Sequence, residues 1–327
     1  MSNKLFYFAL STLLFAFNFP AEAQHPAKMS KVGYLQAGSA ALPTYLEALQ
    51  RELRSLGYIE GKNIIFVSRF AETQYDRLPA LADELVRLKV DVIVTPGSND
   101  TRAAKNATKT IPIVFLGAVS DPVSLGLVDS LARPGGNVTG FTTIGSVLAG
   151  KRLELLKETI PKLARVAMLW NPENEGSAEV WKESQLPAKE LGLQLHSMAV
   201  NSSDQFESGF KEAVKTRSGA LAVTGGALIA NNLKQVISLA AKNRLPAIYN
   251  RVIDVVDGGL MSYGHDESER YRRAAVMVDK ILKGTKPADI PVEQPMKFEL
   301  VINFKTAKAL GLTIPPIVLM RAGRVVK

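Results

Sequence analysis

Apolar residues follow two alternating patterns along the chain, and each pattern predicts a different kind of element. Short runs in which almost every residue is apolar are typical of strands buried on both faces of a parallel sheet. Between them lie segments in which apolar residues recur every three or four positions, as on one helix face. The predicted strands are residues 31–36, 64–68, 91–95, 113–116, 138–142, 165–170, 193–200, 220–224, 246–250, 259–263 and 298–303. The predicted helices are residues 43–56, 78–86, 100–108, 123–131, 153–160, 176–191, 229–243, 274–284 and 306–310, with one more starting near residue 204.

This alternation favours an α/β fold with parallel sheets covered by helices on both faces. A chain of 327 residues is long enough for two domains. The economical arrangement is two doubly wound parallel-sheet lobes joined by a hinge, with the chain crossing near residues 141–146 and 263–266. The expected first lobe is residues 24–143 plus 264–290, and the expected second lobe is residues 144–263 plus 291–327.

Residues 117–140 connect the two halves. Asp121 offers a capping oxygen, and Pro122 suits the first position of a helix. Apolar residues within 123–131 then share one helical face. A Pro-Gly-Gly turn and the short strand 138–142 follow. We therefore expect a capped helix here, as the last unit of the first lobe and the lead into the second.

The first residues of the chain resemble a secretory signal peptide. Lys4 precedes the almost wholly apolar run 5–19, and Ala21-Glu22-Ala23 has the small-x-small pattern of a cleavage site. A membrane anchor is the alternative, but this run is shorter than the ~20 residues that span a bilayer. The chain has no cysteine, which excludes disulfides and a cysteine-linked lipid anchor. We expect residues 1–23 to be removed after Ala23, leaving a protein free in the periplasm.

The formal net charge of +9 raises the question of an acidic partner such as nucleic acid. No run of five or six basic residues occurs, however, and the lysines and arginines are scattered. We therefore expect no nucleic-acid partner and interpret the charge as that of a basic exported protein.

The residues that catalysis or metal binding requires are scarce. The three histidines do not have the spacing of metal ligands, and no nucleophile elbow, phosphate-binding loop or dinucleotide fingerprint occurs. His265, beside Asp266 at a predicted crossing, is the best candidate for chemistry, although capping or a hinge hydrogen bond is favoured there. The sequence therefore predicts no enzyme, no metal and no cofactor.

Ligand binding fits the pattern better. In open parallel α/β sheets, ligands lie beyond the carboxyl ends of the strands. Two such lobes facing each other would place these strand ends around one cleft. The first-lobe candidates are Gln36, Ser39, Ser98, Asn99, Ala118 and Asp121. The second-lobe candidates are Trp170, Asn171, Thr224, Gly225, Tyr249, Asn250 and Tyr263.

Several of these candidates have a structural alternative. Ser98 and Asn99 precede a predicted helix, so they can help its free N–H groups to bind a ligand carboxylate, cap the helix, or do both. Asp121 can pair with a ligand ammonium or cap its own helix. Trp170 and Tyr249 can stack on an aromatic or apolar ligand or pack in the core, and core packing is favoured more for Tyr249.

Several motifs in this order are similar to those of one protein family. They are DPV, GLV, RPGGN and TG within residues 117–140, LGYIEGKN at 56–63, RVAMLWNP at 165–172, GGLMSYG at 258–264, and the long segment 271–316. With this spacing the chain resembles the periplasmic substrate-binding proteins of a bacterial ABC-transporter family that includes tryptophan- and tyrosine-binding members. The resemblance covers nearly all of the chain after the first thirty residues.

The resemblance implies a type I periplasmic-binding-protein-like fold with a third crossing near the proline-rich segment 286–295. It implies a small-molecule ligand, with an amino acid or a related aromatic or apolar compound as the expected class. It also implies a hinge motion that closes the lobes, a monomer, and an ABC permease as partner. A periplasmic sensor that serves a membrane receptor and, less favoured, a secreted enzyme remain alternatives.

Overall fold

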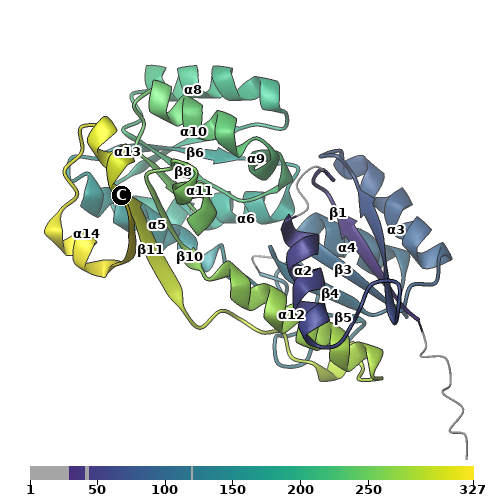
Figure 1. Ribbon diagram of the computed structural model, residues 1–327. Helices are drawn as coiled ribbons and strands as arrows, with labels where there is room; N and C mark the ends of the chain where they lie inside the picture. The colour runs from purple at the N-terminus through teal and green to yellow at the C-terminus, as the bar shows by residue number, and fades with distance from the viewer. Residues whose placement is uncertain (1–28, 41–43, 119–120) are drawn as a thin grey trace, which may run out of the picture.

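The computed structural model describes residues 29–40, 44–118 and 121–327. The predicted signal peptide and its cleavage site lie outside the described residues. The described chain forms two α/β lobes side by side, each built on its own sheet (Figure 1). Both sheets are mainly parallel, which confirms the predicted fold class. Among the described residues, no helix is long and apolar enough to cross a membrane.

The first lobe contains a five-stranded sheet in the order β2-β1-β3-β4-β5, in which every pair is parallel. Its strands are β1 (Ser30–Gln36), β2 (Ile64–Phe70), β3 (Val92–Gly97), β4 (Ile113–Ala118) and β5 (Val138–Gly140). Helices α2 (Thr44–Ser55) and α12 (Glu267–Leu282) pack on one face, and α3 (Leu78–Arg87) and α4 (Ser98–Ala107) pack on the other. Successive residues of β1 therefore enter opposite cores, with Tyr34 on the α12 side and Leu35 on the α3 side.

The second lobe contains a seven-stranded sheet in the order β12-β11-β10-β9-β8-β6-β7. Its strands are β6 (Arg165–Trp170), β7 (Gln194–Ala199), β8 (Ala220–Val223), β9 (Ala247–Tyr249), β10 (Met261–His265), β11 (Phe298–Asn303) and β12 (Ala322–Val326). The pair β10–β11 is antiparallel, and the other pairs are parallel. Its helices are α5 (Val147–Thr159), α6 (Glu175–Glu183), α7 (Gln185–Glu190), α8 (Phe206–Lys215), α9 (Ala227–Asn231), α10 (Leu233–Lys242), α11 (Val252–Val256), α13 (Phe304–Ala309) and α14 (Pro316–Arg321). Among the described residues, three short 3-10 helices lie between these elements. They are η1 (Tyr75–Arg77), which precedes α3 of the first lobe, η2 (Ser203–Gln205), which precedes α8, and η3 (Pro287–Asp289), which follows α12.

The chain passes between the lobes three times (Figure 1). It leaves β5 for α5, returns from β10 to α12, which packs on α2 and β4, and then runs back to β11. The third passage follows the proline-rich segment, where Phe141 pairs with Glu293 in an isolated bridge. The exact lobe boundaries expected from the sequence stay a prediction.

The segment after β4 differs from its expected structure. Asp121 Oδ1 accepts the N–H groups of Val123 (2.9 Å) and Ser124 (3.1 Å), as a cap would. No helix follows, however, and residues 122–133 form consecutive turns instead. Gly126 has φ +63°, which interrupts the helical path. Leu127 is held in the first-lobe core, so tertiary packing decides the conformation of this apolar stretch.

Candidate ligand-binding site

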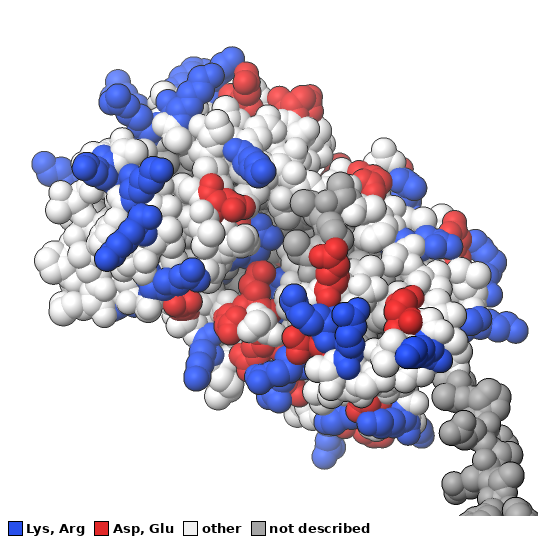
Figure 2. Space-filling model, in the orientation of Figure 1, with Lys and Arg blue, Asp and Glu red and all other residues white. Residues whose placement is uncertain are grey.

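A cavity of about 300 Å³ lies between the two lobes. The first lobe contributes the segments that follow β1 and β3, at the carboxyl ends of parallel strands. The second lobe contributes the start of α6 and the segments that follow β8 and β9. Residues of the crossing segments, including Thr143 and His265, complete the wall. Figure 2 shows the hollow between the lobes, and it also shows lysines and arginines spread over the visible face with acidic residues among them.

Five of the residues expected at the site line this cavity. They are Gln36, Asn99, Thr224, Gly225 and Asn250. The Thr224 hydroxyl lies 2.6 Å from Ser177 Oγ, so the end of β8 is joined to the start of α6. A Cβ on Gly225 would lie 3.0 Å from Asn250 Nδ2, which shows how closely the two strand ends approach.

The aromatic candidates of the second lobe lie outside the cavity. Trp170 stacks on Trp181 with 5.4 Å between ring centroids and 4° between planes, and its Nε1 donates to Ser197 Oγ at 2.9 Å. Tyr249 is 1% exposed and belongs to the core, as its alternative interpretation anticipated. Tyr263 packs on Phe298. None of the three is in position to stack on a ligand in this cavity.

Other candidates also lie away from it. Asn171 is buried beneath the cavity wall, and its backbone N–H donates to Ser177 Oγ. Asp121 stays with its own turn. Ser39 lines a separate hollow beside η1, outside the cavity. Ala118 ends β4, and its side chain lies outside the described structure.

The start of α4 differs from the expected carboxylate site. The helix begins at Ser98, which is 1% exposed and does not line the cavity. The Asp100 side chain takes the capping position, where Oδ2 accepts from Gly97 N and Oδ1 accepts from Ala37 N, each at 2.9 Å. A carboxylate of the chain itself thus lies at the start of this helix, where it binds the N–H groups of Ala37 and of the N-cap residue Gly97. Burial raises the pKa of Asp100 to about 7.

Sequence reasoning singled out His265 but missed the charged side chains around it, which lie where the crossing segments meet the cavity. We call this cluster the hinge end, and it consists of Arg152, Arg251, Asp254, His265, Glu267 and Arg270. Arg251 Nη2 pairs with Asp254 Oδ1 at 2.6 Å, and Arg270 Nη2 pairs with Glu267 Oε2 at 3.1 Å.

Tyr45 of α2 joins the two paired arginines of the hinge end. Its hydroxyl accepts a hydrogen bond from Arg251 Nη1 at 3.0 Å. The Arg270 guanidinium lies 4.9 Å from the centre of its ring, a cation–π contact. Tyr45 of the first lobe therefore contacts both Arg251, which precedes α11, and Arg270 of α12.

His265 is buried at the hinge end, and burial together with the Arg270 charge lowers its pKa to about 4. The imidazole is therefore neutral at neutral pH. Its Nε2 is buried and has no hydrogen-bond partner among the described residues. Those residues also hold no group of three or more acidic or histidine side chains that could bind a metal.

The opposite edge of the cavity is closed by hydrogen bonds between the lobes. We call this edge the rim, and it consists of Tyr75, Asn99, Arg102, Glu173, Asn174 and Glu175. Asn99 Nδ2 donates to the Glu173 carbonyl at 2.9 Å, and Asn99 Oδ1 accepts from Glu175 N at 3.1 Å.

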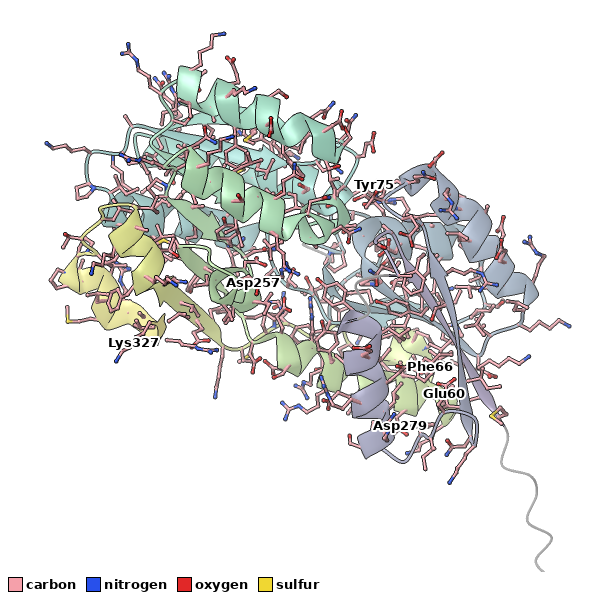
Figure 3. The ribbon with its side chains drawn as sticks, turned by 45° about the horizontal axis from the view of Figure 1, so that its top comes forward. Glu60, Phe66, Tyr75, Asp257, Asp279 and Lys327 are labelled. Atoms are coloured by element: carbon pink, nitrogen blue, oxygen red, sulfur yellow. The ribbon has the colours of Figure 1, made fainter. Side chains whose placement is uncertain are left out.

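Two further contacts complete the rim. Asn174 Nδ2 donates to the Tyr75 hydroxyl at 3.3 Å, and Arg102 pairs with Glu175. Figure 3 shows Tyr75 at the edge of the first lobe where it meets the second, and it shows Asp257 in the second lobe toward the gap. The two lobes are thus in direct contact over the mouth of the cavity.

A signal for the missed arginines is present in the sequence. Arg270 lies four residues before Ala274, and Arg152 lies four residues before Leu156, so each is in line with an apolar stripe, just outside the predicted bounds of the helix. A charged residue on a buried helix face requires a partner, which is a reason to assign it to a site.

The chain is similar in sequence to known substrate-binding proteins. The family model described as ABC transporter substrate binding protein matches residues 38–326. A tyrosine-binding protein from Clostridioides difficile is 30% identical over 262 residues, which cover 80% of this chain and 75% of that protein.

Solved structures agree with this match. Each of the three alignments that follow covers 91% of this chain and 100% of the chain in the solved structure. A conserved domain protein from Vibrio cholerae has a TM-score of 0.85 at 30% identity. An ABC domain from Streptococcus pneumonia in complex with L-Trp has a TM-score of 0.83 at 28% identity. The ligand-free, open structure of a substrate-binding protein with adhesive properties from Clostridium difficile has a TM-score of 0.63 at 27% identity. The chain belongs to the family of ABC transporter substrate-binding proteins.

Proposed function

We propose that this protein is the periplasmic solute-binding component of an ABC importer and that it delivers a small molecule to a permease in the inner membrane. The proposed ligand class is an amino acid or a related apolar or aromatic compound, held between the lobes. The observation that carries the proposal is the cavity of about 300 Å³ walled by strand ends of both lobes and closed over its mouth by the rim. We propose that the protein acts by binding and hinge closure, without catalysis, as a monomer.

The comparison with relatives supports a closed, ligand-competent arrangement. The L-Trp complex and the ligand-free, open structure are almost equally similar in sequence, at 28% and 27% identity, and both are covered completely. Their TM-scores nevertheless differ, at 0.83 and 0.63. A rotation of one lobe against the other lowers such a score without any change within a lobe. The two lobes here therefore match the ligand-bound arrangement better.

A thermal-shift screen of amino acids, aromatic acids, purines and sugars tests the proposed ligand class. A ligand present at about 100 times its Kd should stabilise the protein by about 2.7 kcal/mol. For a protein of this size, that corresponds to a rise in melting temperature of a few degrees. A response to sugars or metal ions alone would show that the ligand class is wrong, and no response at all would contradict the proposed function.

We also propose export with cleavage after Ala23. The apolar run and the Ala21-Glu22-Ala23 pattern support it. N-terminal sequencing of protein from the periplasmic fraction should begin at Gln24. Membrane-bound protein that keeps Met1 would contradict this proposal.

A further inference from the structure

Arg152 of α5 differs from the other charged groups around the cavity. It is 8% exposed, and it lines the cavity at the hinge end. Its Nε donates to the Tyr263 carbonyl at 2.9 Å, and its Nη1 donates to the Gly145 carbonyl at 3.3 Å. The first acceptor lies in β10, the strand that leads into the second passage between the lobes, and the second acceptor lies in the first passage, just before α5. Arg152 therefore sits where the connecting segments converge.

The other two buried arginines each have a carboxylate partner, Asp254 for Arg251 and Glu267 for Arg270. Arg152 forms no ion pair with any described residue, and no described residue accepts a hydrogen bond from its Nη2. The hinge end thus holds three arginines against two carboxylates, an excess of one positive charge.

The remaining carboxylates of the cavity do not compensate for this excess. Asp100 is engaged with two backbone N–H groups at the start of α4. Asp257, at the end of α11, lies on the exposed part of the lining (Figure 3). Asp254 also acts on the Arg152 charge, but its ion pair is with Arg251, so no carboxylate of the described chain pairs with Arg152.

An uncompensated buried cation is unfavourable, because water is removed from the charge and no opposite charge replaces it. Burial lowers the pKa of Arg152 to about 10, and the guanidinium still carries its proton at neutral pH. An anion that enters the cavity relieves this cost. It also gains charge-assisted hydrogen bonds in a site from which water is largely excluded.

The rest of the wall indicates the body of the ligand. The second lobe presents aliphatic side chains to the cavity, namely Val180, Val223, Ile229, Leu233 and Ile253. Tyr45 is the one tyrosine, tryptophan or phenylalanine among the described residues of the lining.

We propose that Arg152 binds the carboxylate of the ligand, and that the ligand is a small organic acid whose apolar body lies against this aliphatic wall. The inference rests on the proposed function and names the chemical class and the recognising residue of the same site. Because Arg152 also donates to the Tyr263 carbonyl of β10 and to the Gly145 carbonyl of the first passage, the anion binds at the hinge end of the cavity.

Matched pairs of compounds test this inference by isothermal titration calorimetry on the mature protein. The pairs are L-leucine, L-tyrosine and L-tryptophan, each with its carboxamide, and the best acid found in the thermal-shift screen with its amide. The wild-type protein should bind the acid about 10- to 100-fold more tightly than the amide, which is the effect of a hydrogen bond to a charged group. Arg152→Gln should weaken binding of the acid by the same factor and leave binding of the amide within about threefold.

Arg165→Gln is the matched control. Arg165 also donates to a main-chain carbonyl, that of Thr216, but it begins β6 at the end of the strand away from the cavity. Its replacement should leave both affinities unchanged. If Arg152→Gln does not fold, as judged by circular dichroism, Arg152→Lys carries the test and should keep the preference for the acid with lower affinity.

The outcomes separate this inference from the proposed function. Equal wild-type affinity for acid and amide, or equal loss of both in Arg152→Gln, would overturn the role of Arg152 in anion recognition. Binding of only uncharged or cationic compounds would overturn the ligand class and leave the transport role standing. Binding of nothing in the screen would contradict the proposed function and, with it, this inference.

Discussion

The hinge end and the rim close the same cavity by different chemistry. At the hinge end the contacts are buried and charged, and the ion pairs are local in sequence, since Arg251–Asp254 and Arg270–Glu267 are each three residues apart. At the rim the contacts join residues more than seventy positions apart and are mostly neutral, as in the bonds of Asn99 to Glu173 and Glu175.

This difference indicates which contacts survive when the lobes separate. Local ion pairs move with their own segment, so opening leaves Arg251–Asp254 and Arg270–Glu267 intact at the hinge end. The rim bonds exist only while the lobes touch. Its ion pair, Arg102–Glu175, has side chains that are 36% and 27% exposed, so water reaches both charges readily on opening. A protein built in this way opens at small cost and keeps these two ion pairs throughout.

The largest effect is expected where a buried pair is broken at the hinge end. Arg270→Gln leaves Glu267 without its partner and removes the cation–π contacts to Tyr45 and Tyr271. The free energy of unfolding in urea should fall by about 3–5 kcal/mol.

Arg273→Gln on the same helix is the control for that variant. Its side chain is 47% exposed, and the loss of its pair with Glu293 should cost no more than about 1 kcal/mol. Equal losses of unfolding free energy in Arg270→Gln and Arg273→Gln would show that the buried pair at the hinge end stabilises the protein no more than an exposed pair.

An intermediate effect is expected from pH, because the two sides of the cavity titrate in opposite directions. His265 has a folded pKa of about 4 against an ordinary 6.5, so the unfolded chain takes up a proton that the folded imidazole does not, and stability falls as pH decreases from about 6.5 to 4. Asp100, beside the rim, has a folded pKa of about 7 against 3.8, so stability falls as pH rises from about 4 to 7. Each contributes a slope of about 1.4 kcal/mol per pH unit, and between about pH 4 and 6.5 the two oppose each other.

Urea unfolding between pH 4 and 7 separates the two groups. Relative to wild type, Asp100→Asn should lose stability on acidification, because only the histidine effect remains. His265→Asn should gain stability on acidification, because only the carboxyl effect remains. Parallel pH profiles for all three proteins would refute both assignments.

The smallest effect is expected at the rim. Asn99→Ala removes hydrogen bonds to Glu173, Asn174 and Glu175 of the other lobe. It should favour the open form by about 1–2 kcal/mol, weaken ligand binding about tenfold, and leave the unfolding of each lobe nearly unchanged. Small-angle scattering of the ligand-free protein should show a larger radius of gyration.

Asn243→Ala provides the comparison within one lobe. Its side chain donates to the Leu239 carbonyl at 2.8 Å, at the end of α10 and away from the rim. This variant should lose a little stability without any change in shape or affinity. If the radius of gyration of Asn99→Ala equals that of the wild-type protein, the rim does not hold the lobes together.

Local sequence patterns determined most of the fold. Continuous apolar runs such as 165–170 and 298–303 became strands with the predicted bounds, because a strand buried on both faces has to be apolar throughout. The predictions were wrong or incomplete where the outcome depends on distant partners. Residues 123–131 have a helical stripe but form turns, and β12 was missed, because it pairs with β11 only after α14 turns the chain back.

For the site, the sequence by itself determined that strand ends of two lobes would face each other, and Gln36, Asn99, Thr224, Gly225 and Asn250 meet there. Only the tertiary structure decided which residues next to those strand ends line the cavity. A side chain one position away, such as Trp170 or Tyr249, points into another layer. Arg152 and Arg270 lie on α5 and α12 just outside the helix bounds predicted from the sequence, and Arg251 precedes α11, which the sequence pattern did not predict. Their charges meet because α5, the segment after β9 and α12 pack around the same end of the cavity, and that convergence is a property of the packed lobes.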